Sequence, residues 1–458
     1  MVEDERLKSL NDKPANADGA YVLYWMQASM RTRYNHALAE AVARAEKLEK
    51  PVVVGFGVMD DYPEANARHY AFMLQGLADV AANLKDKGIR FVLRHGHPAD
   101  VALELAKDAC LVICDRGYTA HQKAWRGTVG GKAGVQAIQV ESDIVVPVET
   151  ASDKLESAAR TIRRKINDRR DDFIQEMRIP SPSKSSLTLG ELEGLDASDW
   201  EGVLEKLKLD RAVKPVSDFT AGEEAGQRLL NTFIDDNLED YADRRSVPHD
   251  GAASRLSPYL HFGNLSPVEI ALKCKNAIAP QSEGLKSFLE EMIVRRELSI
   301  NFVNYCPDYD KYSGAVPDWA QTTLKAHRPD DRPHIYTREE MEAADTHDDI
   351  WNAAMTEMVE RGYLNNHVRM YWVKRIMDWT NTPEYAHETA LYLNNKYFLD
   401  GRDPNSFSNI AWAFGRHDRP FQERAVIGKV RPFTDAALKR RFDVKAYVTR
   451  VRDGDLFY

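Results

Sequence analysis

Cysteine is scarce in this chain, and the cysteines present are not arranged as ligands or disulfide pairs. The 458 residues contain only Cys110, Cys114, Cys274 and Cys306, with no CxxC motif and no Cys/His cluster. Disulfide scaffolds and zinc sites need cysteines at close, repeated spacings. We therefore expect buried, reduced thiols and no metal site.

Long apolar runs are lacking as well. No segment approaches the roughly eighteen consecutive apolar residues that suggest a membrane-spanning helix, which argues against a membrane protein. Residues 1–19 are polar and of mixed charge, without the apolar core of a secretory signal. They predict a disordered leader on a cytoplasmic protein.

The nucleotide-binding motifs GxGxxG and GxxxxGKS are missing from a region that otherwise alternates strands and helices. Short apolar runs occupy 21–25, 51–56, 89–93 and 110–114, and helical patterns between them include 34–48 and 67–84. This alternation predicts an α/β domain over residues 20–150, with a parallel, Rossmann-like sheet covered on both faces. Ligands usually bind beyond the carboxyl ends of such strands. Without the motifs, an ordinary dinucleotide or nucleoside triphosphate site is not expected.

The remaining chain has few strand-like runs, and the total length suggests two domains. Residues 151–220 are irregular and charged, with a basic cluster at 160–170 and a proline- and serine-rich stretch at 179–186 that breaks helices. We predict an interdomain connector there and an all-α domain over 221–458.

Charge is unevenly distributed along the chain. The net charge of -9 argues against a protein that coats nucleic acid indiscriminately. Residues 411–458 differ, with eleven Lys/Arg against six Asp/Glu. This local excess is compatible with a basic face for nucleic acid and equally with a solvated surface.

Three tryptophans in the helical region have a spacing that suggests electron transfer between their indoles. Trp372 and Trp379 are seven residues apart, which on one helix puts both indoles on the same face, roughly 10.5 Å apart along the axis. Trp351 precedes them. An electron can hop between indoles over such a distance, although a buried aromatic stripe explains the same spacing.

Two polar segments suggest ligand binding. Residues 254–263, SRLSPYLHFG, place hydroxyls and an arginine before a predicted helix, as phosphate-binding helix ends do, and an N-capping turn is an equal alternative. Residues 399–405, LDGRDPN, form a polar loop that can hold a ribose or a ring nitrogen, or simply a turn held by its own side chains.

Together these segments resemble one family, the class II cyclobutane pyrimidine dimer photolyases of the photolyase/cryptochrome superfamily. The ordered motifs are SRLSPYLHFG, residues 288–298, RMYW with DW seven residues later, LDGRDPN and KRRFDVKAY at 439–447. The resemblance runs from Tyr24 to Tyr447. It implies an α/β N-terminal domain followed by a helical FAD-binding domain.

The resemblance also implies roles for particular residues around FAD. The implied FAD-binding residues are Tyr241, Ser254, Arg255, Leu256, Ser257, Arg369, Asn394, Asp400, Arg402 and Asp403. Asn394 would face the flavin N5, and Arg369 would pair with Asp400 at the ring. Trp372, Trp351 and Trp379 would carry electrons to the flavin.

The implied activity is light-driven DNA repair by a monomeric carbon–carbon lyase. Excited FADH⁻ would donate an electron to a pyrimidine dimer flipped out of UV-damaged DNA, and the electron would return after the ring splits. Implied catalytic residues are Glu291, Asn394, Met370 and Trp412, and implied DNA contacts are Arg245, Arg431 and Phe421. An antenna chromophore, a deazaflavin or a folate, would sit in the cleft between domains.

Some positions depart from the family pattern. Residues 363–367 read YLNNH where a Lys-Met-His-Gly-aromatic segment is usual, and Phe421 stands where a tryptophan is expected. The alternative is therefore a blue-light-sensing, cryptochrome-like flavoprotein without repair activity. Retention of Glu291, Met370 and Trp412 favours repair. His36 and His69 are predicted to lie on the surface.

Overall fold

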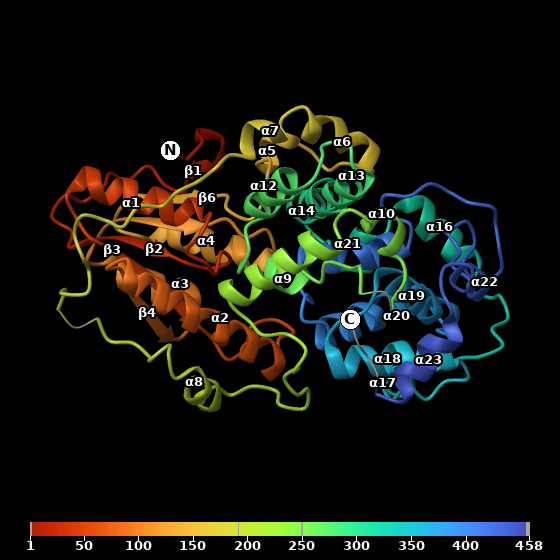
Figure 1. Cartoon of the computed structure of the whole chain (residues 1–458). Helices are drawn as coiled ribbons and strands as arrows, with labels where there is room; N and C mark the ends of the chain where they lie inside the picture. The colour runs from red at the N-terminus through yellow and green to blue at the C-terminus, as the bar shows by residue number, and fades with distance from the viewer. Residues whose placement is uncertain (1, 191, 249–250, 455–458) are drawn as a thin grey trace.

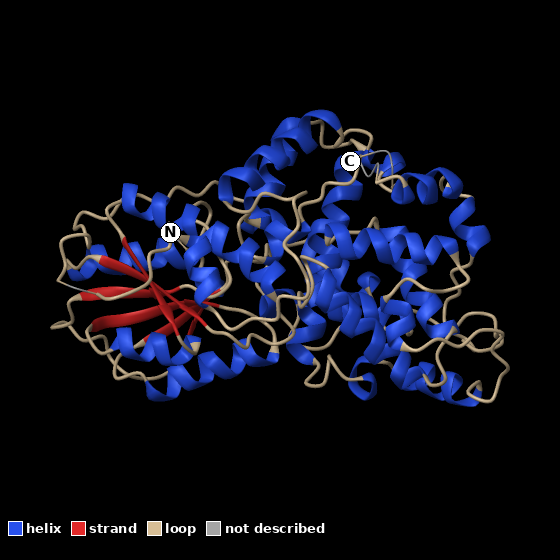
Figure 2. Cartoon of the chain, turned by 90° about the horizontal axis from the view of Figure 1, so that it is seen from below, coloured by secondary structure: helices blue, strands red, loops and turns tan. Residues whose placement is uncertain are grey.

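The structure, a computed structural model, describes residues 2–190, 192–248 and 251–454. Met1 of the predicted leader, Glu191 of the predicted connector and residues 249–250 and 455–458 of the predicted helical domain lie outside the described residues. Figure 1 shows an α/β part beside a larger helical part, and Figure 2 shows the strands gathered at one end of the molecule. The predicted fold class is confirmed.

The N-terminal part is built on a sheet whose order, within the described residues, is β1-β6-β5-β2-β3-β4. Its strands are β1 (Leu7–Ser9), β2 (Tyr21–Trp25), β3 (Val52–Val58), β4 (Arg90–His95), β5 (Ala109–Asp115) and β6 (Ala137–Val140). All neighbours are parallel except the edge pair of β1 with β6. Strands β2, β3, β5 and β6 are buried along their whole length, as expected for a sheet covered on both faces.

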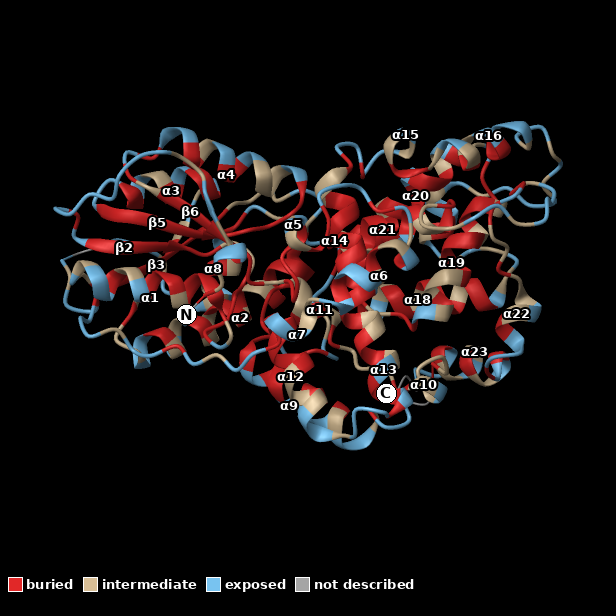
Figure 3. Ribbon diagram, turned by 90° about the horizontal axis from the view of Figure 1, so that it is seen from above, coloured by how far each residue is buried: buried red, intermediate tan, exposed pale blue. Residues whose placement is uncertain are grey.

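Helices cover the two faces of this sheet. Residues of α1 (His36–Leu48) and α2 (Ala67–Asp86) share one hydrophobic cluster with the strands, and residues of α3 (Pro98–Ala106) and α4 (Ala120–Lys132) share another. Figure 3 shows the two helix pairs on opposite sides of buried strands. The alternation of apolar runs and amphipathic patterns predicted this layering.

The prediction of a disordered leader over residues 1–19 is wrong for most of that segment. Leu7–Ser9 pairs with β6 as an antiparallel edge strand. The Arg6 side chain is fully buried and donates to the backbone carbonyls of Glu141, Ile144 and Val145 at 2.8 to 3.0 Å. The buried Arg6 guanidinium, rather than an apolar run, anchors this N-terminal segment. The polar composition of the segment did not indicate such an anchor.

The segment predicted as a connector returns along the edge of the sheet. After the short helices α5 (Val148–Ala151), α6 (Ala159–Asn167) and α7 (Arg170–Phe173), the chain passes β4, where Leu195 forms a backbone bridge with Leu93. Helix α8 (Trp200–Lys206) then packs on α2. The connecting segment therefore contacts the edge strand β4 before the helical part begins.

The helical part contains no strand among its described residues. Its helices are α9 (Glu223–Asp236), α10 (Tyr241–Arg244), α11 (Ser257–His261), α12 (Pro267–Ala277), α13 (Glu283–Leu289), the π-helix η2 (Glu290–Arg295), α14 (Arg296–Tyr305), α15 (Tyr312–Ala315), α16 (Asp318–Ala326), α17 (Arg338–Glu342), α18 (Asp349–Arg361), α19 (Asn366–Asp378), α20 (Pro383–Tyr397), α21 (Pro404–Ala413), α22 (Asp435–Lys439) and α23 (Val444–Arg452). Buried residues concentrate around α14 and α21 (Figure 3). No described helix is long and apolar enough to cross a membrane.

Capping residues set the ends of the helices that matter for the site. Asp348 accepts hydrogen bonds from the backbone N–H groups of Ile350 and Trp351 and so begins α18, which ends at Gly362 with φ at 65°. Asn365 accepts from the His367 N–H and begins α19. These caps place Trp351 in the first turn of one helix and Trp372 within the next. All four cysteines are buried, as predicted.

Candidate functional site

A pocket in the helical part gathers the residues of the predicted phosphate-binding segment. It contains about 550 Å³ of empty space. Its lining comprises Tyr241, Arg245, Ala253, Ser254, Arg255, Leu256, Ser257, Tyr363, Asn365, Asn366 and His367. The five residues Tyr241 and Ser254 to Ser257, which the family resemblance assigned to FAD, are thus brought together.

The backbone and the neighbouring rings shape this phosphate-binding segment. Arg255 has a φ of 55°, a left-handed conformation that non-glycine residues adopt rarely. Its guanidinium lies 4.5 Å from the Phe219 ring centroid and 5.8 Å from that of Tyr363. The hydroxyls of Ser254 and Ser257 line the same pocket. Two hydroxyls and a guanidinium form a donor set that fits a diphosphate.

Arg369, Asn394 and Asp400 form a second polar group. Arg369 donates from Nη2 to Oδ1 of Asn394 over 2.6 Å and from Nη1 to the carboxylate of Asp400 over 3.2 Å. The guanidinium carbon also lies 3.9 Å from the centroid of the Phe398 ring. Asn394 is fully buried. The arginine therefore fixes an amide and a carboxylate in one arrangement, as expected for groups that bind a heterocyclic ring.

Two predicted cofactor residues lie elsewhere. Arg402 and Asp403 line a different cavity, at the boundary with the α/β part, rather than the pocket of Ser254 and Ser257. The chain turns at Arg402, whose φ is 68°, and Asp403 accepts from the Asn405 N–H to begin α21. Because of this turn, Arg402 and Asp403 face a different side from Asp400. The LDGRDPN motif alone does not show that its residues diverge in this way.

The three predicted electron-transfer tryptophans are in ring contact. The rings of Trp351 and Trp372 are nearly parallel, with their centroids 6.4 Å apart. The ring centroids of Trp351 and Trp379 are 5.5 Å apart. The Nε1 of Trp351 donates to the backbone carbonyl of Trp372, whereas the buried Nε1 of Trp372 has no hydrogen-bond partner among the described residues. Trp372 also contacts Phe398, beside Arg369. The order along the row is therefore Trp372, Trp351, Trp379.

Further aromatic rings extend this row beyond Trp379. Tyr336 and His347 contact the Trp379 ring with centroid distances of 5.4 Å and 5.3 Å. The Tyr336 hydroxyl and His347 Nδ1 are 2.8 Å apart, and His334 stacks on His347 at 3.6 Å. Both histidines are exposed. These residues were not predicted, because they come from loops with no sequence signal that relates them to Trp379.

Glu291 and Arg245 pair at the mouth of the phosphate-binding pocket. Arg245 Nη1 lies 3.0 Å from Glu291 Oε1, and both side chains are about one-third exposed. Glu291 belongs to η2, and the extra residue of a π-helical turn is frequent at functional sites. The predicted dimer-contacting carboxylate and the predicted phosphate-contacting guanidinium therefore lie side by side.

Another predicted group surrounds Arg431. Its guanidinium carbon lies 4.5 Å from the Phe421 ring centroid and 5.7 Å from that of Trp412, and Nε is 2.6 Å from the Asp418 carboxylate. Behind Trp412, Lys374 donates to the backbone carbonyl of Ala413, and burial lowers the pKa of Lys374 to about 7. The structure thus brings Trp412, Phe421 and Arg431 together.

The departures at 363–367 face the phosphate-binding pocket. Tyr363, Asn365, Asn366 and His367 line it, and Asn365 Nδ2 donates to the Arg245 carbonyl at 3.0 Å. Met370 lies one turn further along α19, its sulfur 3.9 Å from Asn366 Nδ2. The residues that depart from the family pattern therefore form part of the pocket wall, and one of them, Asn366, contacts Met370.

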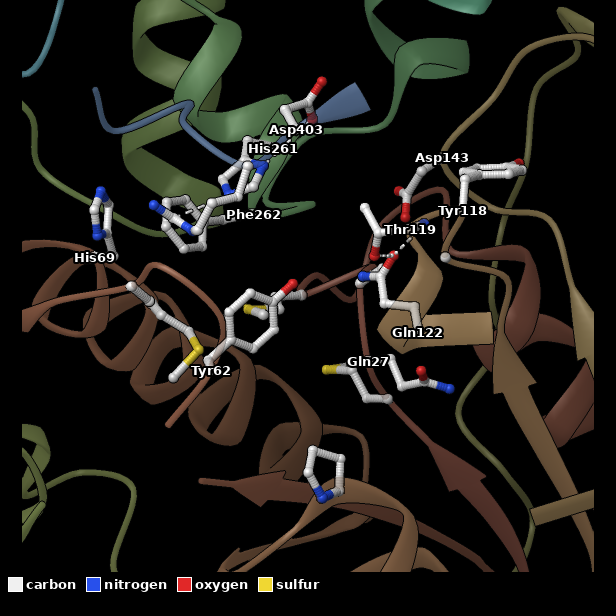
Figure 4. A pocket seen from close by; sticks show the side chains of 18 of the residues that line it. Gln27, Tyr62, His69, Tyr118, Thr119, Gln122, Asp143, His261, Phe262 and Asp403 are labelled. Carbon is white, nitrogen blue, oxygen red and sulfur yellow. Dashed lines mark hydrogen bonds and ion pairs between the residues drawn. The ribbon is translucent and has the colours of Figure 1, made fainter. Parts of the chain in front are cut away.

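A second cavity, with about 1100 Å³ of space that is partly open to solvent, lies where the α/β part meets the helical part. Its walls include Met26, Gln27, Met59, Tyr62, His69, Tyr118, Thr119, Gln122, Trp125, Asp143, His261, Phe262, Arg402 and Asp403. Figure 4 shows side chains of both parts facing one space, among them Tyr62 and Gln122 from one and His261 and Asp403 from the other. The cavity lies beyond the carboxyl ends of β2, β3 and β5, as the sheet predicts. Of its wall residues, only Arg402 and Asp403 were predicted to bind a ligand.

Burial keeps His69 and Tyr62 in the cavity wall, and His121 next to them, neutral. It lowers the pKa of His121 to about 4 and that of His69 well below its usual value, and it raises the pKa of Tyr62 to about 12. The rings of Tyr62, His121 and Trp125 contact one another. A neutral, aromatic wall of this kind suits a flat organic ligand.

The prediction that His36 and His69 lie on the surface is wrong. Both are buried. His69 accepts from the Asn66 N–H at Nδ1, and its Nε2 donates to the carbonyl of Phe398 in the helical part. A contact between two parts of the chain cannot be read from local sequence.

Comparison with known proteins identifies the family. The family model described as DNA photolyase matches residues 22–183. The deoxyribodipyrimidine photo-lyase of Methanothermobacter thermautotrophicus is 42% identical over 99% of both chains, and that of Potorous tridactylus is 37% identical over 94% of this chain and 81% of the relative. A solved photolyase from Sulfolobus tokodaii, described with two FAD molecules, has a TM-score of 0.71 at 16% identity and covers 94% of this chain and 89% of that one. On the strength of the two long sequence matches, this chain belongs to the DNA photolyase family.

Proposed function

We propose that this protein is a DNA-repair enzyme, a deoxyribodipyrimidine photo-lyase of class II that splits cyclobutane pyrimidine dimers in light. Photolyase activity follows from the long matches to curated photo-lyases. The class and the residue roles rest on the sequence motifs. The observation that carries the proposal is the row of Trp372, Trp351 and Trp379, which begins beside Arg369, Asn394 and Asp400.

FAD is the proposed cofactor. The pocket of Ser254, Arg255 and Ser257 would hold its diphosphate, and Arg369, Asn394 and Asp400 would hold its ring. Bound and reduced there, FAD would supply the light-driven one-electron chemistry by which the dimer ring is opened. Arg369 balances negative charge at the ring, and the tryptophan row delivers electrons from the protein surface.

Damaged DNA is the proposed substrate, with the dimer flipped out of the duplex. Glu291 would hydrogen-bond the dimer, and Met370 and Trp412 would pack against its rings. Arg245 and Arg431 would contact flanking phosphates, and Phe421, against which Arg431 stacks, would fill the gap that the dimer leaves. The pairing of Arg245 with Glu291 favours repair over light sensing alone, because it holds a carboxylate at the mouth of the pocket.

An antenna chromophore, a deazaflavin or a folate, is proposed for the cavity between the two parts. The aromatic wall of Tyr62 and Trp125 and the amide of Gln122 support a flat ligand with polar edges. A fluorescent compound that absorbs light and co-purifies with the protein, but not with Met59→Trp at a partly buried position in the cavity wall, would support it.

The decisive experiment combines reduced, FAD-loaded protein with DNA that contains cyclobutane dimers. Blue light should restore pyrimidine absorbance, and darkness should not. A protein that binds and photoreduces flavin but restores no absorbance would instead be a light sensor of the cryptochrome type.

A further inference from the structure

We propose that Asn395 and Glu64 act as positioning residues that set the orientation of the Asn394 side-chain amide. The inference rests on the proposed function, in which Asn394 faces the flavin. Asn394 and Asn395 are adjacent on α20, and Glu64 belongs to the α/β part.

A chain of hydrogen bonds joins the three side chains. Asn394 Nδ2 donates to Asn395 Oδ1 at 3.0 Å, and Asn395 Nδ2 donates to Glu64 Oε2 at 2.6 Å. Both asparagines are fully buried. A buried amide that loses its partner costs free energy, so this chain resists rearrangement.

Groups that can only donate fix the orientation of both amides in this chain of hydrogen bonds. The Arg369 guanidinium can only donate, and it donates to Asn394 Oδ1. The Arg402 backbone N–H can only donate, and it donates to Asn395 Oδ1 at 2.9 Å. Glu64 Oε2 in turn accepts from Asn395 Nδ2. Reversing either amide would place donor against donor at one end or the other.

One orientation of Asn394 therefore satisfies all its neighbours. Its Oδ1 is directed to Arg369 and one Nδ2 hydrogen to Asn395, which leaves the second Nδ2 hydrogen and one oxygen lone pair for a ligand. The hydrogen-bonding groups that Asn394 offers to a flavin are thus set by residues that do not themselves face it.

The two parts of the chain hold this arrangement across their interface. Asn66 Nδ2 donates to the carbonyl of Lys396 at 2.7 Å, and Arg68 Nη1 donates to that of Tyr397 at 2.6 Å. These bonds fix the backbone next to Asn395. Glu64 has a left-handed φ of 59°, a conformation that the surrounding structure must impose on a non-glycine residue.

The first test measures Asn394 itself, in full-length protein without flavin. In protein labelled with ¹⁵N-asparagine, the Asn394 side-chain amide is assigned from an Asn394→Asp variant. We expect one of its two protons to exchange slowly with water in the wild type and at least tenfold faster in Asn395→Leu. Glu64→Leu, a change at an exposed residue that preserves folding if the buried change does not, should also accelerate it. Glu64→Gln keeps an acceptor and should behave as wild type.

The second test measures the midpoint potential of bound FAD. Asn395→Leu and Glu64→Leu should shift it, whereas Glu64→Gln should not. Lys123→Met is the matched control, because it removes bonds to the carbonyls of Val303 and Asn304 across the same interface and lies away from the amide chain. An equal shift in Lys123→Met, or unchanged exchange and potential in Asn395→Leu and Glu64→Leu, would overturn the inference. Failure of the wild type to bind FAD would overturn the proposed function, and the exchange measurement would still decide the inference.

Discussion

Trp351 stacks on Trp372 with an interplanar angle of 10°, and its indole nitrogen donates to the Trp372 carbonyl. The contact fixes the middle ring of the row against the ring nearest Arg369. Electron transfer along the row and chemistry at the dimer should therefore be separable by mutation.

We expect Trp372→Phe to slow photoreduction of bound FAD by at least tenfold, because the first indole of the row is lost while a ring of similar shape remains. Repair by chemically reduced protein should stay within about twofold of wild type. Flavin absorbance under blue light measures the first quantity and dimer repair the second. Trp200→Phe, in α8, is the control. A parallel loss of repair in the chemically reduced variant would contradict the division.

Glu291→Gln should lower the repair rate of bound dimers on the order of tenfold, the value of one charge-assisted hydrogen bond. Binding to dimer-containing DNA should change much less, because Arg245 remains and is freed from its carboxylate. Repair under single-turnover conditions and a binding titration separate the two effects. Glu290→Gln, which instead pairs with Arg163 and Arg295, is the neighbouring control.

Arg431→Gln should weaken binding to damaged DNA about tenfold and reduce the slope of log affinity against log salt by about one. The guanidinium is partly exposed, and its pairing with Asp418 and its stacking on Phe421 keep it in place. Binding isotherms at several salt concentrations provide the measurement. Lys107→Gln, on the exposed end of α3, should change neither. An unchanged salt slope in Arg431→Gln would place the DNA elsewhere.

Glu297 should make stability depend on pH. Burial raises the pKa of its carboxyl from 4.5 to about 8, although the side chain accepts from the backbone N–H groups of Val145 and Val146. The folded state therefore binds the proton more tightly than the unfolded state. The contribution of this group to stability is greatest below pH 4.5 and falls as pH rises to about 8, by roughly 5 kcal/mol.

Glu297→Gln removes this ionisation and keeps an acceptor for both N–H groups. Its Tm relative to wild type should rise steadily between pH 5 and pH 8, measured by thermal unfolding at each pH. The exposed Glu239→Gln should give a flat difference. A flat difference for Glu297→Gln as well would refute the assignment.

Gly263→Ala should be strongly destabilising. Gly263 has a φ of 68°, and an added Cβ would lie 1.8 Å from the carbonyl oxygen of Ala28, in the other part of the chain. Because backbone must move, we expect a loss of roughly 2 to 4 kcal/mol. Gly127→Ala, in α4 with no heavy atom within 4 Å of its Cβ position, should be neutral or slightly stabilising. Denaturant unfolding of both variants is the measurement.

Local sequence was informative where one segment determines one feature. The apolar runs predicted the sheet, and the residues at 254–257 and the three tryptophans came together as their motifs suggested. Features made by distant segments were missed. Arg6 inserts into a turn some 135 residues away, and Asn66 and His69 bond to carbonyls more than 300 residues away. None of these contacts produces a periodic pattern in the sequence. That Arg402 lines the cavity between the two parts was not predicted, because one left-handed residue redirects the LDGRDPN loop.

The bonds from Asn66, Arg68 and His69 to the carbonyls of Lys396, Tyr397 and Phe398 limit how this protein can be recombined with its relatives. A chimera that joins the α/β half of one photolyase to the helical half of another would keep both cores, yet it would lose this match unless residues 64–69 were exchanged together with residues 394–402.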